Sequence, residues 1–294
     1  MKRGLIGIVV LMGTAPVLAW HSEGHVLATD LAVEAVSPYL PTFFREGRAT
    51  ISHCSVDPDV FKISVGDGTL SSREYPDHYF DMEWFDLNDL PNTRTGFFYA
   101  SLSAGHSFAS IGTLPYALIE GTERLTLALA EYRSWPDDRA IQHKCWVYAG
   151  WLAHYAQDAC QPLHATVNYN QYGIHNQVDA VLHRLPPEER PVIDPNERVS
   201  YEDLREAIKQ VIRQSNALVD EVYALTDLWP ADNDLELTNP AIITWTRASL
   251  ERSSRFTAEL YLTAWVQSEF VELPDWHQRG EIHEESCYNS PSDM

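Results

Sequence analysis

The sequence has little positive charge. Its 294 residues include 21 Lys plus Arg against 42 Asp plus Glu, which gives a formal net charge of -21. Proteins that hold nucleic acid through a broad surface do so mainly with Lys and Arg, which neutralise phosphates. We therefore expect no stable duplex DNA partner. Any phosphate chemistry must be confined to a local site, and bound divalent cations are one way to create such a site in an acidic protein.

The sequence also contains little strict alternation of apolar and polar residues and no internal repeat. Instead, apolar residues recur three and four positions apart, which is typical of helices. One such series is Leu114, Leu118, Leu125, Leu129 and Tyr132. Ile141 to Gln157 is apolar on most sides and is predicted to form a buried central helix. Further helices are predicted near residues 23–36 and 241–268, the latter with Pro240 in its first turn.

Long apolar runs are absent except at the N-terminus. Lys2 and Arg3 precede an apolar run from Leu5 to Met12, and Val17-Leu18-Ala19 follows with short residues at the cleavage-site positions. This pattern predicts a signal peptide at residues 1–19 and a secreted or periplasmic protein that begins at Trp20. A membrane anchor is the alternative, but the run is shorter than the roughly 20 residues that span a bilayer. We expect no transmembrane segment elsewhere.

These patterns favour an all-α protein with a single multi-helix domain at residues 20–275 and a polar tail at residues 276–294. We expect it to be a monomer. Two Pro-marked segments, at residues 186–198 and 229–240, are predicted to be surface loops of that domain. The sequence has only four cysteines: Cys54, Cys145, Cys160 and Cys287. An even number in an exported chain permits disulfides and leaves their pairing open.

The predicted central helix carries a candidate metal site. His154 and Asp158 are four residues apart, and so are His175 and Asp179. This spacing places both side chains of a pair on one face of a helix. Pro162 should end or bend the helix and let His164 turn toward a second centre. His and Asp within such an apolar helix are costly to bury unless they are paired or metal-bound, and ligands without thiolate favour Zn²⁺ at a hydrolytic site.

The N-terminus of the processed chain offers further ligands. The free amine and the carbonyl oxygen of Trp20 could chelate one ion, with His25 nearby in the first helix. An α-amine titrates near pH 8, at about 7.7 to 8.0, so a metal could displace its proton at neutral pH. Taken alone, a Trp after a signal peptide is more often an ordinary core residue.

The ordered motifs of the chain resemble those of the zinc-dependent phospholipases C and the single-strand nucleases of S-one/P-one type. The motifs are Trp20-x-x-x-Gly24-His25, Pro58-Asp59, His78-Tyr-Phe-Asp81, His154-x-x-x-Asp158-x-x-Gln161-Pro162-Leu163-His164 and His175-x-x-x-Asp179. The resemblance spans most of the processed chain. It implies a mostly helical fold in which nine residues hold three Zn²⁺ ions.

The resemblance assigns the nine ligands to three ions. The first ion would be held by Asp59, His78, His154 and Asp158, the second by Trp20, His25 and the shared Asp158, and the third by His164, His175 and Asp179. Asp57 lies two residues from Asp59 and is an alternative ligand. The Pro58-Asp59 dipeptide favours Asp59.

The resemblance also implies a mechanism, in which hydroxide that bridges two zinc ions attacks phosphorus and the third ion takes up charge on the phosphoryl and leaving oxygens. Asp59 would orient or deprotonate the attacking water, and Lys62 would contact the phosphate, although an exposed structural Lys is an equal alternative. Tyr79 and Asn168 are the candidate substrate-binding residues. Tyr79 could equally be a core aromatic residue.

Two groups of sequence features favour different substrate classes. The short gap from Trp20 to His25, Asp rather than Glu at Asp179, and Lys62 favour a nuclease or nucleotidase that acts on single-stranded nucleic acid. The loop between His164 and His175, which lie 11 positions apart, favours a phospholipase C that acts on phospholipid. We favour the nuclease. An inactive metal-binding protein is a hypothesis of a different class, and nucleophilic catalysis by a Cys160–His164 pair is the least favoured reading.

Overall fold

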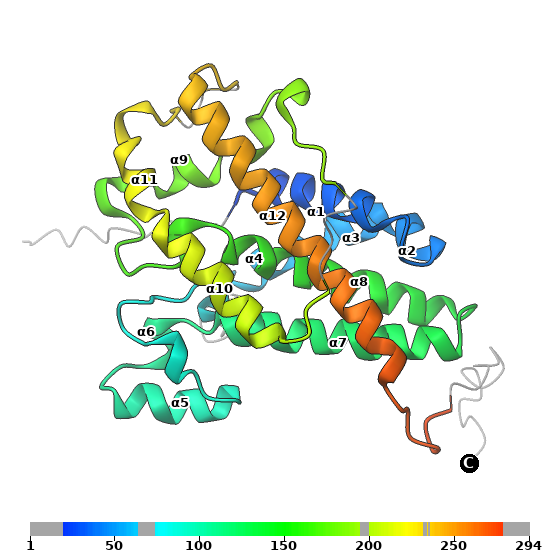
Figure 1. Ribbon diagram of the computed structural model, residues 1–294. Coiled ribbons are helices and arrows are strands. Elements are labelled where there is room, and N and C mark those ends of the chain that lie inside the picture. Colours follow the sequence, from blue (N-terminus) through cyan, green and yellow to red (C-terminus); the bar gives the residue numbers. More distant parts are fainter. Residues whose placement is uncertain (1–19, 64–73, 195–199, 232–233, 235, 279–294) are drawn as a thin grey trace, which may run out of the picture.

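The computed structural model describes residues 20–63, 74–194, 200–231, 234 and 236–278 (Figure 1). Every regular element in these segments is a helix, which confirms the all-α class. No helix in these segments is both long enough and apolar enough to cross a bilayer. The predicted signal peptide and most of the predicted tail lie outside the described residues.

The α-helices differ widely in length. They are α1 (Ser22–Val36), α2 (Thr42–Glu46), α3 (Arg48–Cys54), α4 (Asp57–Phe61), α5 (Arg94–Ser103), α6 (Phe108–Ile111), α7 (Leu114–Ser134), α8 (Arg139–Ala159), α9 (His175–Asp179), α10 (Leu204–Ala217), α11 (Val219–Ala224) and α12 (Pro240–Gln267). The short 3₁₀ helices are η1 (Tyr75–His78), η2 (Leu87–Asp89), η3 (Pro162–His164), η4 (Gln171–Gly173), η5 (Leu182–Arg184), η6 (Pro187–Glu189), η8 (Thr226–Leu228) and η9 (Ser268–Phe270).

The predicted central helix is α8. The Asp138 side chain caps its first turn by accepting hydrogen bonds from the backbone N–H groups of Ala140 and Ile141. The helix ends at Ala159, and Pro162 opens η3 in a new direction, as the sequence predicted. Helices α7, α3, α12 and α1 all pack against α8, and Figure 1 shows α7 beside it. The inner face of α8 is therefore shielded from water by several elements at once.

Two clusters of buried apolar side chains hold the helices together. The larger one contains apolar residues of α7, α8 and α12 together with Phe43 and Phe44 of α2. The smaller one joins Trp20 to Leu163, Leu182 and Trp245. Leu31 of α1 packs against both clusters, so they form a continuous interior. The start of the described chain is thereby fixed beside the segments that follow α8.

Gly150 lets α3 approach α8 closely, which gives a first prediction. A Cβ atom there would lie 2.6 Å from Cys54 Cβ and 2.6 Å from the Ile51 carbonyl oxygen. Ala is usually favoured over Gly in a helix by about 1 kcal/mol. At this contact, overpacking should outweigh that gain and cost about 1 to 3 kcal/mol. We expect Gly150→Ala to lower the free energy of unfolding measured in denaturant.

Gly121→Ala in α7 is the matched control. The nearest atom to an added Cβ there is Leu152 Cδ1 at 3.2 Å, the far end of a flexible side chain. We expect this variant to keep or gain stability. A Gly150→Ala protein as stable as the unmodified chain would contradict the close contact between α3 and α8.

Candidate metal centre

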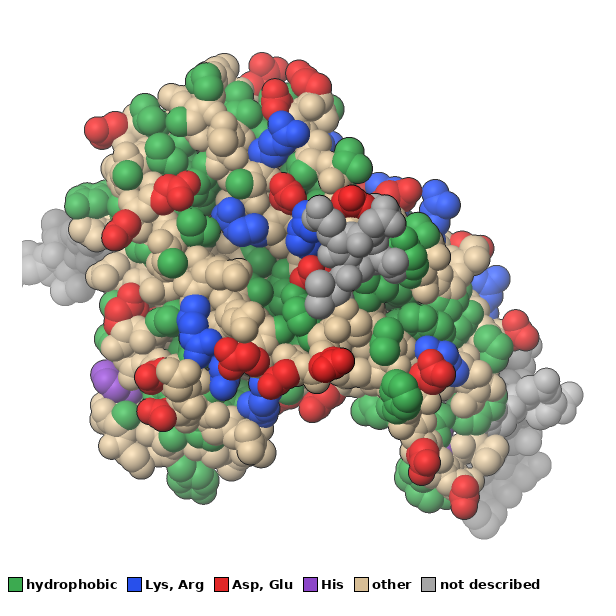
Figure 2. All heavy atoms as spheres, in the orientation of Figure 1, with side chains coloured by type: hydrophobic (Ala, Val, Ile, Leu, Met, Phe, Trp, Pro, Cys, Tyr) green, Lys and Arg blue, Asp and Glu red, His purple; other side chains and the backbone are tan. Residues whose placement is uncertain are grey.

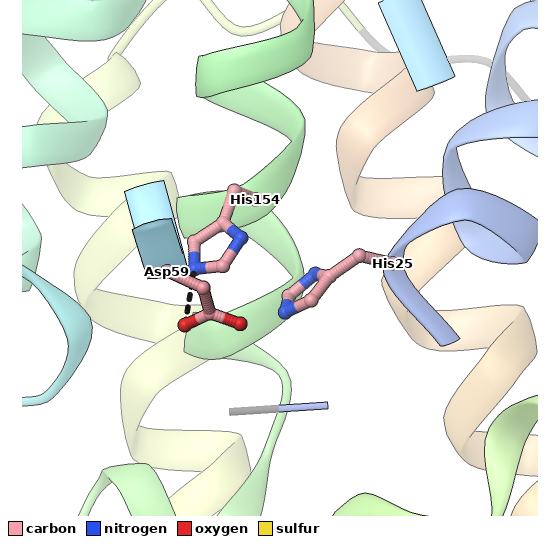
Figure 3. Close-up of side chains that lie close together, drawn as sticks. All are labelled: His25, Asp59 and His154. Atoms are coloured by element: carbon pink, nitrogen blue, oxygen red, sulfur yellow. Dashed lines mark ion pairs between the residues drawn. The ribbon is translucent and has the colours of Figure 1, made fainter. Parts of the chain in front are cut away.

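Buried His and Asp side chains converge in three clusters in the described part of the chain. Within each cluster the candidate ligand atoms lie within 4.8 Å of one another. The first cluster contains His25, Asp59 and His154, the second contains His78, His154 and Asp158, and the third contains His164, His175 and Asp179. Figure 3 shows the first cluster, in which His25 of α1 and His154 of α8 lie around the Asp59 carboxylate.

Asp158 joins the clusters. Its Oδ2 atom lies 2.9 Å from His78 Nδ1 and 3.4 Å from His154 Nε2. Its Oδ1 atom lies 3.7 Å from His25 Nε2 and 3.7 Å from His164 Nδ1. One fully buried carboxylate therefore touches imidazoles from four different segments of the chain.

The clusters combine local spacing with long-range packing. His154 and Asp158 lie four residues apart on α8, and His175 and Asp179 span α9 with His175 Nε2 3.2 Å from Asp179 Oδ2. These two pairs follow from helix geometry. His25, Asp59 and His78 arrive from α1, α4 and η1, and only the packing of those elements against α8 brings them there.

Several candidate ligands are oriented by a hydrogen bond to one of their two polar side-chain atoms. His154 Nδ1 bonds to the Ser55 carbonyl oxygen at 2.8 Å, and His164 Nδ1 bonds to the His78 carbonyl oxygen at 2.7 Å. Gln161 Nε2 donates to Asp179 Oδ1 at 2.6 Å. Such bonds orient metal ligands and leave their other polar atom for an ion.

The remaining polar atoms of the clusters fit a metal. Among the described residues, the buried atoms of these clusters that have no hydrogen bond include His25 Nε2, His78 Nε2, Asp158 Oδ1, Asp179 Oδ2 and both ring nitrogens of His175. Leaving buried polar atoms without partners costs free energy. A cation that accepts their lone pairs removes that cost, so the donor set and its orphaned atoms suit a divalent metal.

Burial sets the protonation states of the clusters. Burial lowers the pKa of His25 and His154 to about 4, so both imidazoles are neutral at pH 7. Burial raises the pKa of Asp158 to about 6 and raises the pKa of Asp179 well above its usual range. For Asp59, burial also acts upward, but its interactions with His154 and Lys62, including the hydrogen bond from Lys62, outweigh burial and lower the pKa.

The structure separates Asp59 from Asp57. Asp59 belongs to the first cluster, whereas Asp57 Oδ2 accepts a hydrogen bond from Trp151 Nε1 at 3.0 Å. Lys62, at the end of α4, places Nζ 2.6 Å from Asp59 Oδ1, and its side chain is 4% exposed. Lys62 is thus a buried ion-pair partner of Asp59. The alternative of an exposed structural Lys is wrong, because this side chain is buried.

A cavity of about 250 Å³ opens beside the clusters. Its walls include His78, His164 and His175, and they also include Tyr79, whose hydroxyl donates to the Ala109 carbonyl oxygen. Asn168 is exposed and does not line the cavity, although its neighbours Val167 and Tyr169 do. The loop turns between them, so the substrate-binding role of Asn168 stays a prediction.

Several cavity residues were missed by the sequence analysis. They are Tyr75, Asp81, Trp84 and Tyr169. Asp81 belongs to the motif His78-Tyr-Phe-Asp81, and Tyr75 and Tyr169 each lie close in sequence to a predicted site residue. No sequence pattern indicated a role for Trp84. Burial and the nearby Glu83 raise the pKa of Asp81 to about 7. Among the described residues, the cavity therefore combines aromatic walls with the carboxyl group of Asp81.

The sequence permitted disulfides, but the cysteines that the structure describes form none. Cys54, Cys145 and Cys160 are buried and free, and Cys287 lies outside the described residues. Burial raises the pKa of the Cys160 thiol to about 12, so the reactive thiolate is disfavoured. His164 directs Nδ1 to the His78 carbonyl oxygen. This geometry gives no support to a Cys160–His164 nucleophilic pair.

No protein-family model matches the chain, and no curated protein matches it in sequence. Among solved structures, the alpha-toxin of Clostridium perfringens from avian strain SWCP is similar, with a TM-score of 0.44 and 13% identity. The match covers 87% of this chain and 66% of the toxin chain. The chain thus spans about two thirds of the length of that structure.

Proton competition at Asp158 gives a prediction for metal binding. Below pH 6 the metal-free Asp158 carboxyl holds a proton that an incoming ion must displace, whereas His25 and His154 stay neutral to about pH 4. We expect the affinity for Zn²⁺ to fall by at least about tenfold in total between pH 6 and 4.5. Competition with a chelator of known pH dependence measures it. Equal affinities at pH 7 and 5 would contradict the prediction.

Proposed function

We propose that this protein is a zinc-dependent phosphodiester hydrolase. The observation that carries the proposal is the convergence of three buried His and Asp clusters on Asp158, beside a cavity with aromatic walls. When bound, zinc ions supply positive charge to phosphoryl oxygens and lower the pKa of coordinated water. The three Asp ligands would leave three Zn²⁺ ions with an excess of positive charge, which attracts a phosphodiester to an otherwise acidic protein.

The proposed ligand set is the one that the resemblance implies. Asp59, His78, His154 and Asp158 would hold one ion, and His164, His175 and Asp179 would hold another. The remaining ion would take Asp158, His25 and the N-terminal Trp20. Two contacts support the Trp20 assignment: Trp20 is fully buried with Nε1 donating to the Gln157 carbonyl oxygen, and the His21 N–H donates to the Asp179 carbonyl oxygen.

Asp59 and Lys62 would act on the reacting groups. The lowered pKa of Asp59 keeps its carboxylate ionised, so it can accept a hydrogen bond from the attacking water and orient it. Lys62 borders the cavity and pairs with Asp59, which places its charge where a phosphate oxygen would enter. Its ammonium also lies 5.9 Å from the centre of the Tyr75 ring.

Single-stranded nucleic acid is the favoured substrate. Tyr79 and Tyr75 pack edge to face at 5.7 Å, and their rings offer surfaces on which an unpaired base can stack. On the face drawn in Figure 2, Lys and Arg side chains are scattered among Asp and Glu and form no broad basic surface. Local stacking together with metal charge suits a splayed single strand better than a duplex.

A phospholipase C is the second candidate, because the same cavity holds Asp81 near aromatic rings. A carboxylate and aromatic faces attract a quaternary ammonium head group. The short loop between His164 and His175 favours the same substrate class. A metal-binding protein without activity is the third candidate.

A side-by-side assay tests the function. The zinc-loaded chain that begins at Trp20 is incubated with single-stranded nucleic acid and with short-chain phosphatidylcholine, each with and without chelator. We expect chelator-sensitive release of nucleotides. Release of phosphocholine would instead establish the phospholipase, and inactivity on both substrates would contradict both enzyme proposals.

Asp158→Asn and Asp57→Asn are a matched pair for this assay. Asp158 joins the clusters, so its loss should remove nearly all turnover, at least about a hundredfold. Asp57 lies outside the clusters, so Asp57→Asn should retain most activity.

The N-terminal ligand has its own test. One Ala placed before Trp20 converts the free amine to an amide, which removes an amine ligand. We expect the extended chain to bind one Zn²⁺ ion more weakly by at least about tenfold, measured by chelator competition and metal content. The chain that begins at Trp20 is the control. Equal zinc content and affinity in both chains would exclude the amine as a ligand.

A further inference from the structure

Gln157, in the last turn of α8, is fully buried and directs its side chain to α1. Its Oε1 atom lies 2.7 Å from His25 Nδ1, and its Nε2 donates to Thr29 Oγ1 at 2.9 Å. Its backbone carbonyl accepts a hydrogen bond from Trp20 Nε1 at 3.1 Å. One residue that is not itself a candidate ligand therefore contacts two proposed ligands of the same ion.

The orientation of the Gln157 amide determines which nitrogen of His25 carries the proton. Because the amide nitrogen donates to the Thr29 hydroxyl, the amide oxygen faces His25. An amide oxygen can only accept, so His25 Nδ1 must carry the hydrogen, and in a neutral imidazole Nε2 then has a free lone pair. That Nε2 atom is buried, has no hydrogen bond among the described residues, and lies 3.7 Å from Asp158 Oδ1.

A comparison with two other imidazoles of the clusters shows why the Gln157 side chain matters. His154 and His164 each direct Nδ1 to a backbone carbonyl oxygen, from Ser55 and His78 respectively. Those acceptors belong to the main chain and no substitution removes them. His25 directs its Nδ1 to a side chain, so its tautomer depends on the identity of residue 157.

We propose that Gln157 is a positioning residue that selects the Nδ1–H tautomer of His25 and so presents Nε2 as a metal ligand. In this orientation the amide nitrogen donates to Thr29 Oγ1, so both ends of the amide have a partner on α1. The proposal rests on the metal-binding role of His25 proposed above, and it is independent of which phosphodiester the enzyme cleaves. Outer hydrogen-bond partners of this kind typically change metal affinity by about 10- to 100-fold when they are removed.

The first test needs neither metal nor substrate. Nitrogen-15 chemical shifts of His25 in the metal-free protein at pH 7 report its tautomer. We expect the Nδ1–H form in the unmodified chain and the loss of that preference in Gln157→Leu. The control is Gln142→Leu, the same change near the start of α8, where the side chain bonds to the Pro136 carbonyl oxygen. An Nε2–H tautomer in the unmodified chain would overturn the proposal, even if Gln157→Leu failed to fold.

The second test measures Zn²⁺ affinity by chelator competition. We expect Gln157→Leu to weaken one bound ion by about 10- to 100-fold and leave the others unchanged. Gln157→Glu keeps an acceptor for His25 Nδ1 and should restore most of the affinity, whereas Thr29→Val, which frees the amide, should give an intermediate loss. A merely structural role would not be rescued by Glu in this way. Unchanged affinity in a folded Gln157→Leu protein would overturn the proposal, whatever its phosphodiesterase activity.

Discussion

The arrangement of this protein depends on a buried carboxylate, Asp158, on the inner face of an apolar helix. A fully buried carboxylate is costly unless opposite charge or hydrogen bonds compensate it. Here Asp158 lies between 2.9 and 3.7 Å from imidazoles of four segments, which are neutral at pH 7 because burial lowers the pKa of each. Neutral imidazoles compensate a carboxylate poorly. A divalent cation compensates it well, which is why the cluster favours metal binding.

Hydrogen bonds from the candidate ligands to the backbone attach the site to the rest of the fold. The backbone of residues 78–80 and His164 bond reciprocally: the Phe80 N–H donates to the His164 carbonyl oxygen at 2.8 Å, and His164 Nδ1 bonds to the His78 carbonyl oxygen at 2.7 Å. Ser55, between α3 and α4, contributes its carbonyl oxygen to His154. These hydrogen bonds therefore fix the short segments around Ser55, His78 and His164 in position beside the clusters. Orientation of the ligands and attachment of these segments are parts of one hydrogen-bond network.

The cavity beside the clusters is the place where we expect substrate preference to be determined. The cavity beside the clusters takes its walls from residues 75–84 and from the loop after His164, which is itself anchored by Glu83 through hydrogen bonds to Thr166 and the Val167 N–H. Aromatic rings with one carboxyl group accept either a base or a cationic head group. His78, His164 and His175 belong to both the clusters and the cavity walls, so a molecule in this cavity would lie directly beside the candidate metal ligands.

The sequence by itself determined the features that arise from local geometry. Apolar periodicity is a property of a single helix, so it predicted α1, α8 and α12, and the four-residue spacing placed His154 with Asp158 and His175 with Asp179. The sequence favoured Asp59 over Asp57 and left Asp57 as an alternative, and the tertiary structure decided between these two residues. Packing against Trp151 turns Asp57 away and leaves Asp59 in a cluster, and the loop turns Asn168 outward and Tyr169 into the cavity. It also decided that Gln157 contacts His25, 132 positions away in sequence. These outcomes depend on contacts between distant segments, and no local pattern encodes them.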